Sequence, residues 1–139
     1  MSANIEPIDH DADAGFEITA DSLPELFRAA ALGMLDIILD RRKLESRTTR
    51  LVAVENESAD LLLVDFLSEI LSVVQGDRFG MFDIEMGEVT EKLAIAEVSG
   101  QRGIPMDAVK TEIKQVTYHQ LKTEKNKTGQ WVARVIFDL

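Results

Sequence analysis

Acidic groups gather near both ends of this sequence. Residues 9–13 read Asp-His-Asp-Ala-Asp, so three carboxylates and one imidazole fall within five positions. At the other end, Asp138 stands beside Leu139, whose α-carboxylate adds a second acid group. Carboxylate oxygens suit hard cations such as Ca²⁺, Mg²⁺ and Mn²⁺, although one short run rarely completes the shell. For residues 9–13 two interpretations stay open, a cation site and an Asp-rich turn that bonds its own backbone.

The N-terminal spacing is not that of an EF-hand. Asp9, Asp11 and Asp13 match the alternating ligands at the start of such a loop. Position six is Ala14 where the loop needs glycine, and position twelve is Ala20 where it needs glutamate. Any cation bound here must take ligands from elsewhere in the chain.

The C-terminal residues 131–139 predict a strand. They are apolar and largely β-branched, and they alternate with period two. Strand character that reaches the last residue would hold the α-carboxylate of Leu139 in a fixed place. The alternation puts Asp138 on the same side as Arg134 and Ile136.

Two helices are predicted to support these ends. Ser22 and Glu25 form a capping-box pattern before a helix whose apolar residues keep helical spacing as far as residue 38. Ser58 is placed to cap a second helix over 59–75, which carries a broad apolar stripe.

The remaining segments alternate as strands. The longest signal is a hairpin that joins residues 109–123 to 131–139 through an Asn-Lys-Thr-Gly turn. Several connections between strands are too short for helical crossovers. We therefore expect one α+β domain over residues 1–139, with two helices packed on one face of a curved, mainly antiparallel or mixed β-sheet.

Composition narrows the functional classes. Cysteine is absent, which excludes disulfides and thiolate zinc sites. The formal charge of −10 argues against stable direct binding to nucleic acid and permits a cation or a basic protein partner, or serves solubility alone. No apolar run approaches the ~20 residues that span a bilayer. We expect a cytoplasmic protein with no membrane partner.

Three segments together resemble the archease family. The first is residues 9–15, Asp-His-Asp-Ala-Asp-Ala-Gly, similar to that family's Asp/Glu-His-Thr-Ala-Asp-Val/Ile-Gly signature. The second is residues 62–71, Leu-Leu-Val-Asp-Phe-Leu-Ser-Glu-Ile-Leu. The third joins residues 113–119, Ile-Lys-Gln-Val-Thr-Tyr-His, to the closing 135–139, Val-Ile-Phe-Asp-Leu. Their order and spacing fit over nearly the whole chain.

The resemblance implies an α+β fold with a strand-helix-strand-strand core and a role without catalysis. Archeases are partners of the RNA ligase of tRNA splicing, and they promote its guanylylation and multiple turnover. The family's metal, with calcium first and magnesium or manganese as alternatives, would be bound here by Asp13, Asp138 and the carboxylate of Leu139. Lys114 matches a family lysine and is a candidate for contact with phosphate or partner, or else an ordinary lysine on a sheet face.

The chain departs from the family pattern at three places. Asp11 replaces the threonine of the signature and adds negative charge, whose role is open. Residues 103–107 stand where many members carry Arg-His, so a contact to partner or nucleotide would differ. Phe66 replaces a core tryptophan. His119 is interpreted as structural rather than as a ligand.

Two other functions remain open at this point. One is a metal-dependent hydrolase of nucleotides or phosphoesters, with Asp13 and Asp138 as metal ligands. Against it, the sequence offers no nucleophile paired with a base and no glycine-rich phosphate loop. The other is a chaperone-like interaction module whose metal is structural.

Overall fold

The computed structural model describes residues 3–10, 13–118 and 122–139, and every structural statement below refers to these residues. The side chains of Asp9, His10 and Asp13 are outside this description. The main elements, in chain order, are β1 (Ala3–His10), β2 (Asp13–Ala20), α1 (Leu23–Ile38), β3 (Thr48–Glu55), α2 (Ala59–Leu71), β4 (Phe79–Val89), β5 (Leu93–Arg102), β6 (Gln115–Val116), β7 (Lys122–Lys125) and β8 (Trp131–Asp138). Single turns of other helix types lie at η1 (Arg41–Lys43), η2 (Ser72–Gly76) and η3 (Met106–Ala108).

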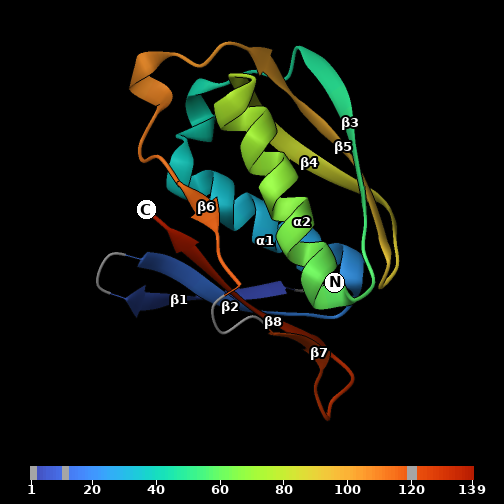
Figure 1. Ribbon diagram of the computed structural model, residues 1–139. Helices are drawn as coiled ribbons and strands as arrows, with labels where there is room; N and C mark the ends of the chain where they lie inside the picture. The colour runs from blue at the N-terminus through green and yellow to red at the C-terminus, as the bar shows by residue number, and fades with distance from the viewer. Residues whose placement is uncertain (1–2, 11–12, 119–121) are drawn as a thin grey trace.

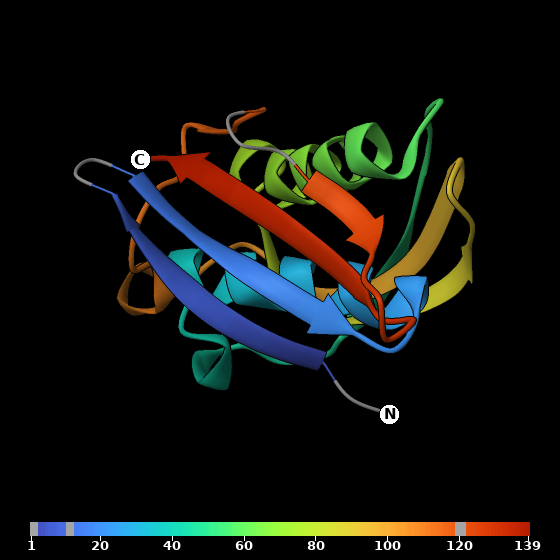
Figure 2. The same ribbon diagram turned by 90° about the horizontal axis from the view of Figure 1, so that it is seen from below.

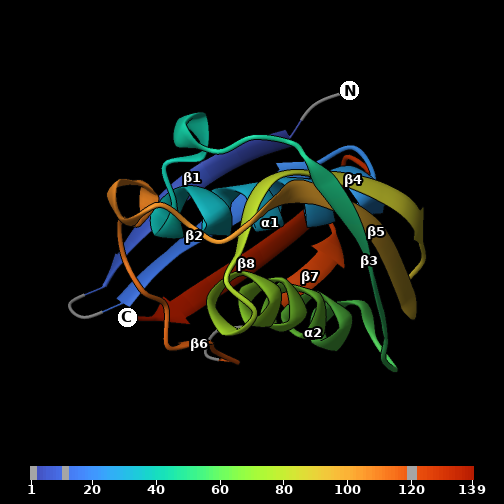
Figure 3. The ribbon, with the colours of Figure 1, turned by 90° about the horizontal axis from the view of Figure 1, so that it is seen from above.

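The described strands form two antiparallel sheets. One has the order β1-β2-β8-β6, with β7 also paired to β8, and the other has the order β3-β5-β4. Helices α1 and α2 lie between them, and each contacts strands of both sheets (Figures 1 and 3). The predicted α+β class with antiparallel pairing is confirmed.

The strands divide between two sheets, whereas the sequence suggested one curved sheet. The burial of α2 gives the physical reason. Its buried side chains include adjacent pairs such as Leu62 with Leu63 and Phe66 with Leu67, which point in different directions around the helix. A helix that is apolar over so wide an angle must be covered on more than one side, and the second sheet supplies that cover.

The hairpin prediction is wrong in extent. Among the described residues after Val109, only Gln115–Val116 and Lys122–Lys125 form strands paired to β8, so the single long strand expected over 109–123 is not found. Ile113 and Val116 are both buried, a spacing of three that a regular strand does not produce. The pairing of Val116 with Phe137 and that of Lys122 with Arg134 differ by three in register.

The two helices begin differently. Ser22 accepts a hydrogen bond from the backbone N–H of Glu25 at 3.3 Å and donates one to its carboxylate at 3.0 Å, which confirms the predicted cap. Ser58 occupies the N-cap of α2 without a capping hydrogen bond from its side chain. Its hydroxyl donates to the carboxylate of Asp60, which itself accepts from the N–H of Leu61.

This contrast leads to a stability prediction. Ser22→Ala should lower the free energy of unfolding by about 1 kcal/mol, because the N–H of Glu25 loses its acceptor. Ser58→Ala should cost less than half as much, since no backbone N–H depends on that hydroxyl. Urea denaturation of both variants measures the difference, and equal losses would contradict the assignment of the cap.

In the described part of the chain, no helix combines the length and apolarity needed to cross a membrane.

Candidate metal site and comparison with known proteins

The end of β8 lies between two other strands. Asp138 is opposite Asp13 of β2 on one side and opposite Gln115 of β6 on the other. The backbone N–H of Lys114 donates to the carbonyl of Asp138 at 2.8 Å. Figure 2 shows the end of β8, marked C, beside the beginning of β2. Residues from three distant parts of the sequence therefore meet here.

The alternation predicted for β8 is found on its core face, whereas Ile136, on the side of Arg134, is also buried. Val135 and Phe137 are fully buried on the face toward the helices, where Phe137 meets Phe16 edge to face at 5.2 Å between ring centroids. Arg134 is on the opposite face, where it pairs with Glu17 at 3.0 Å. Asp138 follows the same period as Arg134 and is partly exposed, so its carboxylate is accessible from outside the core.

Asp13 and Asp138 are cross-strand neighbours in register. Such neighbours have α-carbons roughly 4.5–5.5 Å apart in antiparallel sheets. This is close enough for two carboxylates to share one ion. Among the side chains that the structure describes, which exclude that of Asp13, no three His, Asp or Glu groups form a metal cluster. The ligand set therefore stays a prediction from the family resemblance, and the backbone register supports its two aspartates.

Leu139 follows the last residue of β8. Its side chain is partly buried and packs against the core. A packed side chain restrains the backbone that carries the α-carboxylate. Lys114 is exposed, and its backbone N–H is bonded to Asp138, so residue 114 lies at the same edge of the sheet. Asp11 and His119 lie outside the described residues.

The donor chemistry fits a hard divalent cation. Every predicted ligand atom is a carboxylate oxygen, and no sulfur or imidazole ligand is required. Gln115, whose side chain carries an amide oxygen, lies opposite Asp138 and was missed by sequence reasoning. Its position opposite Asp138 depends on the register of β6, which the expected long strand did not reveal.

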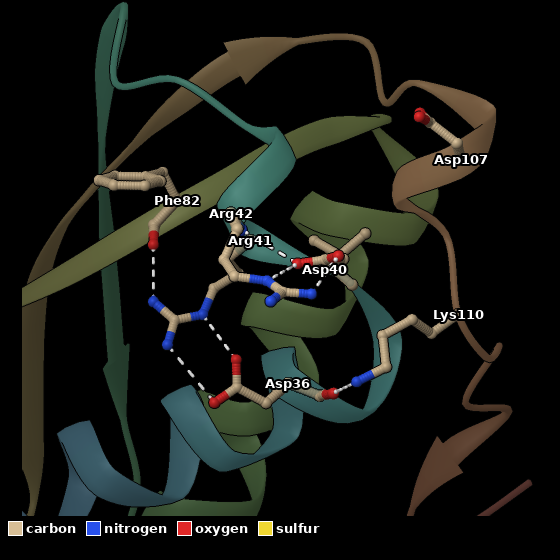
Figure 4. A pocket seen from close by; sticks show the side chains of 8 residues that line it. Asp36, Asp40, Arg41, Arg42, Phe82, Asp107 and Lys110 are labelled. Atoms are coloured by element: carbon tan, nitrogen blue, oxygen red, sulfur yellow. Dashed lines mark hydrogen bonds and ion pairs between the residues drawn. The ribbon is translucent and has the colours of Figure 1, made fainter.

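A second candidate site is a hollow of about 550 Å³ at the C-terminal end of α1 (Figure 4). Arg41 binds the carboxylate of Asp36 at 2.8 Å and donates to the carbonyl of Phe82 at 2.8 Å. Lys110 donates to the carbonyl of Asp36 at 2.7 Å. These bonds attach η1 and the segment after η3 to the end of α1. Because its cations are already bound to protein oxygens, we interpret this hollow as structural.

The same region contains a strongly shifted acid. The Arg42 guanidinium bonds both oxygens of Asp40, at 2.9 and 3.0 Å, and lowers the pKa of that carboxyl from 3.8 to about 2. Because the folded pKa lies below the unfolded value, the stabilisation is complete above about pH 4 and is lost as the pH falls through 2.

Arg42→Ala should return the Asp40 pKa toward 3.8, because the principal hydrogen bonds to the charged form disappear. An NMR titration of the side-chain carboxyl carbons between pH 1.5 and 6 measures it. Arg28→Ala removes an equal charge from a residue bonded to Asp83 and should leave the Asp40 titration unchanged. A low pKa that persists without Arg42 would contradict the assigned cause.

The protein is a small α+β protein in which two antiparallel sheets enclose the helices. Asp13 and Asp138 are paired where β2 meets β8. Residues 6–139 match the archease protein family. The protein archease of Pyrococcus abyssi is 36% identical over 139 residues, which cover 96% of this chain and 97% of the relative. That of Methanosarcina acetivorans is 35% identical over 139 residues and covers 96% and 94%.

Solved structures agree with this comparison. The solution structure of protein 1598 from Methanobacterium thermoautotrophicum is 29% identical, with a TM-score of 0.77 over 97% of this chain and 98% of the other. An archease and possible chaperone from Thermotoga maritima shares the fold, with a TM-score of 0.66, 21% identity and 96% coverage of each chain. This chain belongs to the archease family.

Proposed function

We propose that this protein activates a tRNA-splicing RNA ligase without being an enzyme itself. It promotes guanylylation of the ligase and its multiple turnover, and a divalent cation at the end of β8 takes part. Membership of the archease family supports the proposal. The main structural support for the metal site is the strand register, which sets Asp13 opposite Asp138.

Asp13, Asp138 and the α-carboxylate of Leu139 would hold the ion, with calcium as the first candidate and magnesium or manganese as alternatives. When bound, such an ion supplies positive charge that neutralises phosphate oxygens. The residues of this chain keep the carboxylates together. The β2–β8 pairing aligns the two aspartates, and the packed side chain of Leu139 restrains the chain end.

The charge of the chain suits a protein partner. A formal charge of −10 favours docking on a basic surface and accelerates the encounter at low ionic strength. Lys114 is an exposed cation at the edge of an acidic site and is our candidate for contact with a phosphate or with the ligase. These groups bind and orient the partner, and the ligase performs the chemistry.

The test combines the protein with an RNA ligase from the same organism, GTP and a divalent cation, and follows the covalent guanylate on the ligase. We expect faster guanylylation and more than one turnover when the protein is present. An RNA ligase that is equally active without it would refute the activator function.

The main alternative is a metal-dependent hydrolase of nucleotides or phosphoesters. It predicts turnover of such a substrate by the isolated protein with added cation, whereas the activator function predicts none. A chaperone-like module is the third possibility. It predicts that the protein raises the folded yield of the ligase without changing the rate at which folded ligase is guanylylated.

A further inference from the structure

Arginines gather at one end of the three-stranded sheet. This end joins the beginning of β3, the end of β5 and the beginning of β4, which lie together at the top of Figure 1. Its sheet-end arginines are Arg47, Arg50, Arg78 and Arg102. Residues 45–50, 77–80 and 100–103 together carry these four cations and two carboxylates. The rest of the chain carries eleven basic and twenty-three acidic residues, so this end is positive on an otherwise acidic protein.

The strand register places Arg50 and Arg102 on the same face of the three-stranded sheet. Arg102 is opposite Phe79, and Arg50 is opposite Val98. Phe79 and Val98 are buried toward the helices, so both arginines continue that face beyond the edge of the core. The guanidinium of Arg50 lies over the Phe79 ring at 5.7 Å from its centroid.

Two adjoining hollows open between these side chains. One, of about 440 Å³, is lined by Thr48, Thr49, Arg50, Asp77, Phe79 and Arg102. The other, of about 370 Å³, is lined by Arg47, Thr48, Gln101 and Arg102. Thr48 and Arg102 border both, so the two hollows share a wall that carries one guanidinium and one hydroxyl group. Donor groups of this kind bind oxyanions.

The arginines that line the two hollows differ in their ion pairs with carboxylates. Arg50 pairs with Asp77 at 3.0 Å, but both side chains are substantially exposed, at 41% and 54%. Exposed pairs of this kind contribute little to stability, so a stronger anion can displace Asp77. Arg47 pairs with Glu45, also at the surface. Among the described residues, no carboxylate forms an ion pair with the exposed Arg102.

We propose that Arg47, Arg50 and Arg102 bind a ligand with at least two adjacent phosphate groups, one in each hollow. Arginine forks match phosphate oxygens bidentately, and the Thr48 hydroxyl adds a donor. The aromatic ring at this site, Phe79, is buried under Arg50 and offers no surface for stacking a base. The site therefore recognises the phosphates rather than the bases of its ligand, and Asp77 competes with them for Arg50.

The test is a titration of the intact protein, at low salt, with inorganic tripolyphosphate and separately with a short single-stranded RNA. Arg102→Ala should weaken binding about tenfold, since charge-assisted bonds to both hollows are lost. Asp77→Asn should strengthen binding about threefold, because Arg50 is released and a like charge is removed. Arg42→Ala is the matched control, since it removes an equal charge from a residue paired to Asp40 elsewhere.

The two probes separate the sources of the phosphates. Binding of tripolyphosphate alone identifies a small polyphosphate-bearing ligand, and binding of RNA identifies a nucleic-acid backbone. Equal affinities in the wild type, Arg102→Ala and Asp77→Asn would overturn the proposal, as would absence of binding to both probes. The outcome is independent of the proposed function, because Asp138→Asn should leave phosphate binding intact.

Discussion

Asp138→Asn should abolish activation of the ligase and weaken cation binding by roughly two orders of magnitude, since affinity varies over decades with the number of charged ligands. The substitution keeps the shape of the side chain and removes its charge. Asp138 is partly exposed, and its strand is held by backbone bonds to β2 and β6, so the fold should be retained. Isothermal titration with Ca²⁺ and the guanylylation assay measure the two losses.

Asp107→Asn is the matched control for this prediction. Asp107 is exposed on η3, and its carboxylate pairs with Lys43 at 3.4 Å, so the change should leave cation affinity unaltered. A single glycine added after Leu139 tests the third ligand, because it converts that α-carboxylate into a neutral amide. If Asp138→Asn binds Ca²⁺ as tightly as the wild type, the ligand set is wrong.

Much of the fold follows from local signals in the sequence. The Ser22 cap and the apolar spacing of α1 are short-range features, and both are found as predicted. The alternation in 131–139 also predicts which β8 residues face the core, and the strand stops one residue before Leu139. Each of these patterns is set by neighbours within a few positions.

The features that the sequence did not reveal depend on distant contacts. The division into two sheets is decided by how α2 is covered, and the interruption between β6 and β7 by the pairing of each with β8. Ser58 showed the limit of a local pattern, because its hydroxyl binds Asp60 instead of capping α2. The proximity of Asp13 and Asp138 was predicted from the family resemblance and not from local patterns. The structure pairs the two residues through the register of β2 with β8.

The register itself can be tested at Gly15. Gly15 is opposite Ile136, two residues along β2 from Asp13. A β-carbon at Gly15 would lie 2.4 Å from the carbonyl oxygen of Val135 and 3.1 Å from the α-carbon of Ile136. Both atoms belong to the backbone of β8, so no rotamer change relieves the clash. Close approach of these two strands therefore requires glycine here.

We expect Gly15→Ala to lower the free energy of unfolding by about 1–3 kcal/mol, the usual cost of forcing atoms into a packed region. The gain of about 0.5–1 kcal/mol that alanine normally brings to a strand offsets part of the clash. Gly87→Ala is the control, because its nearest neighbour would be the Ile95 carbonyl at an ordinary 3.4 Å. Urea denaturation should show a loss at residue 15 and none at residue 87.

The same variant links packing to function. Separation of β2 from β8 at Gly15 shifts Asp13 relative to Asp138, so Gly15→Ala should also weaken Ca²⁺ binding, although it changes no charge. A variant that is destabilised but binds Ca²⁺ normally would show that the ion does not depend on this strand pairing. A variant of unchanged stability would show that the two backbones are not as close at Gly15 as the structure places them.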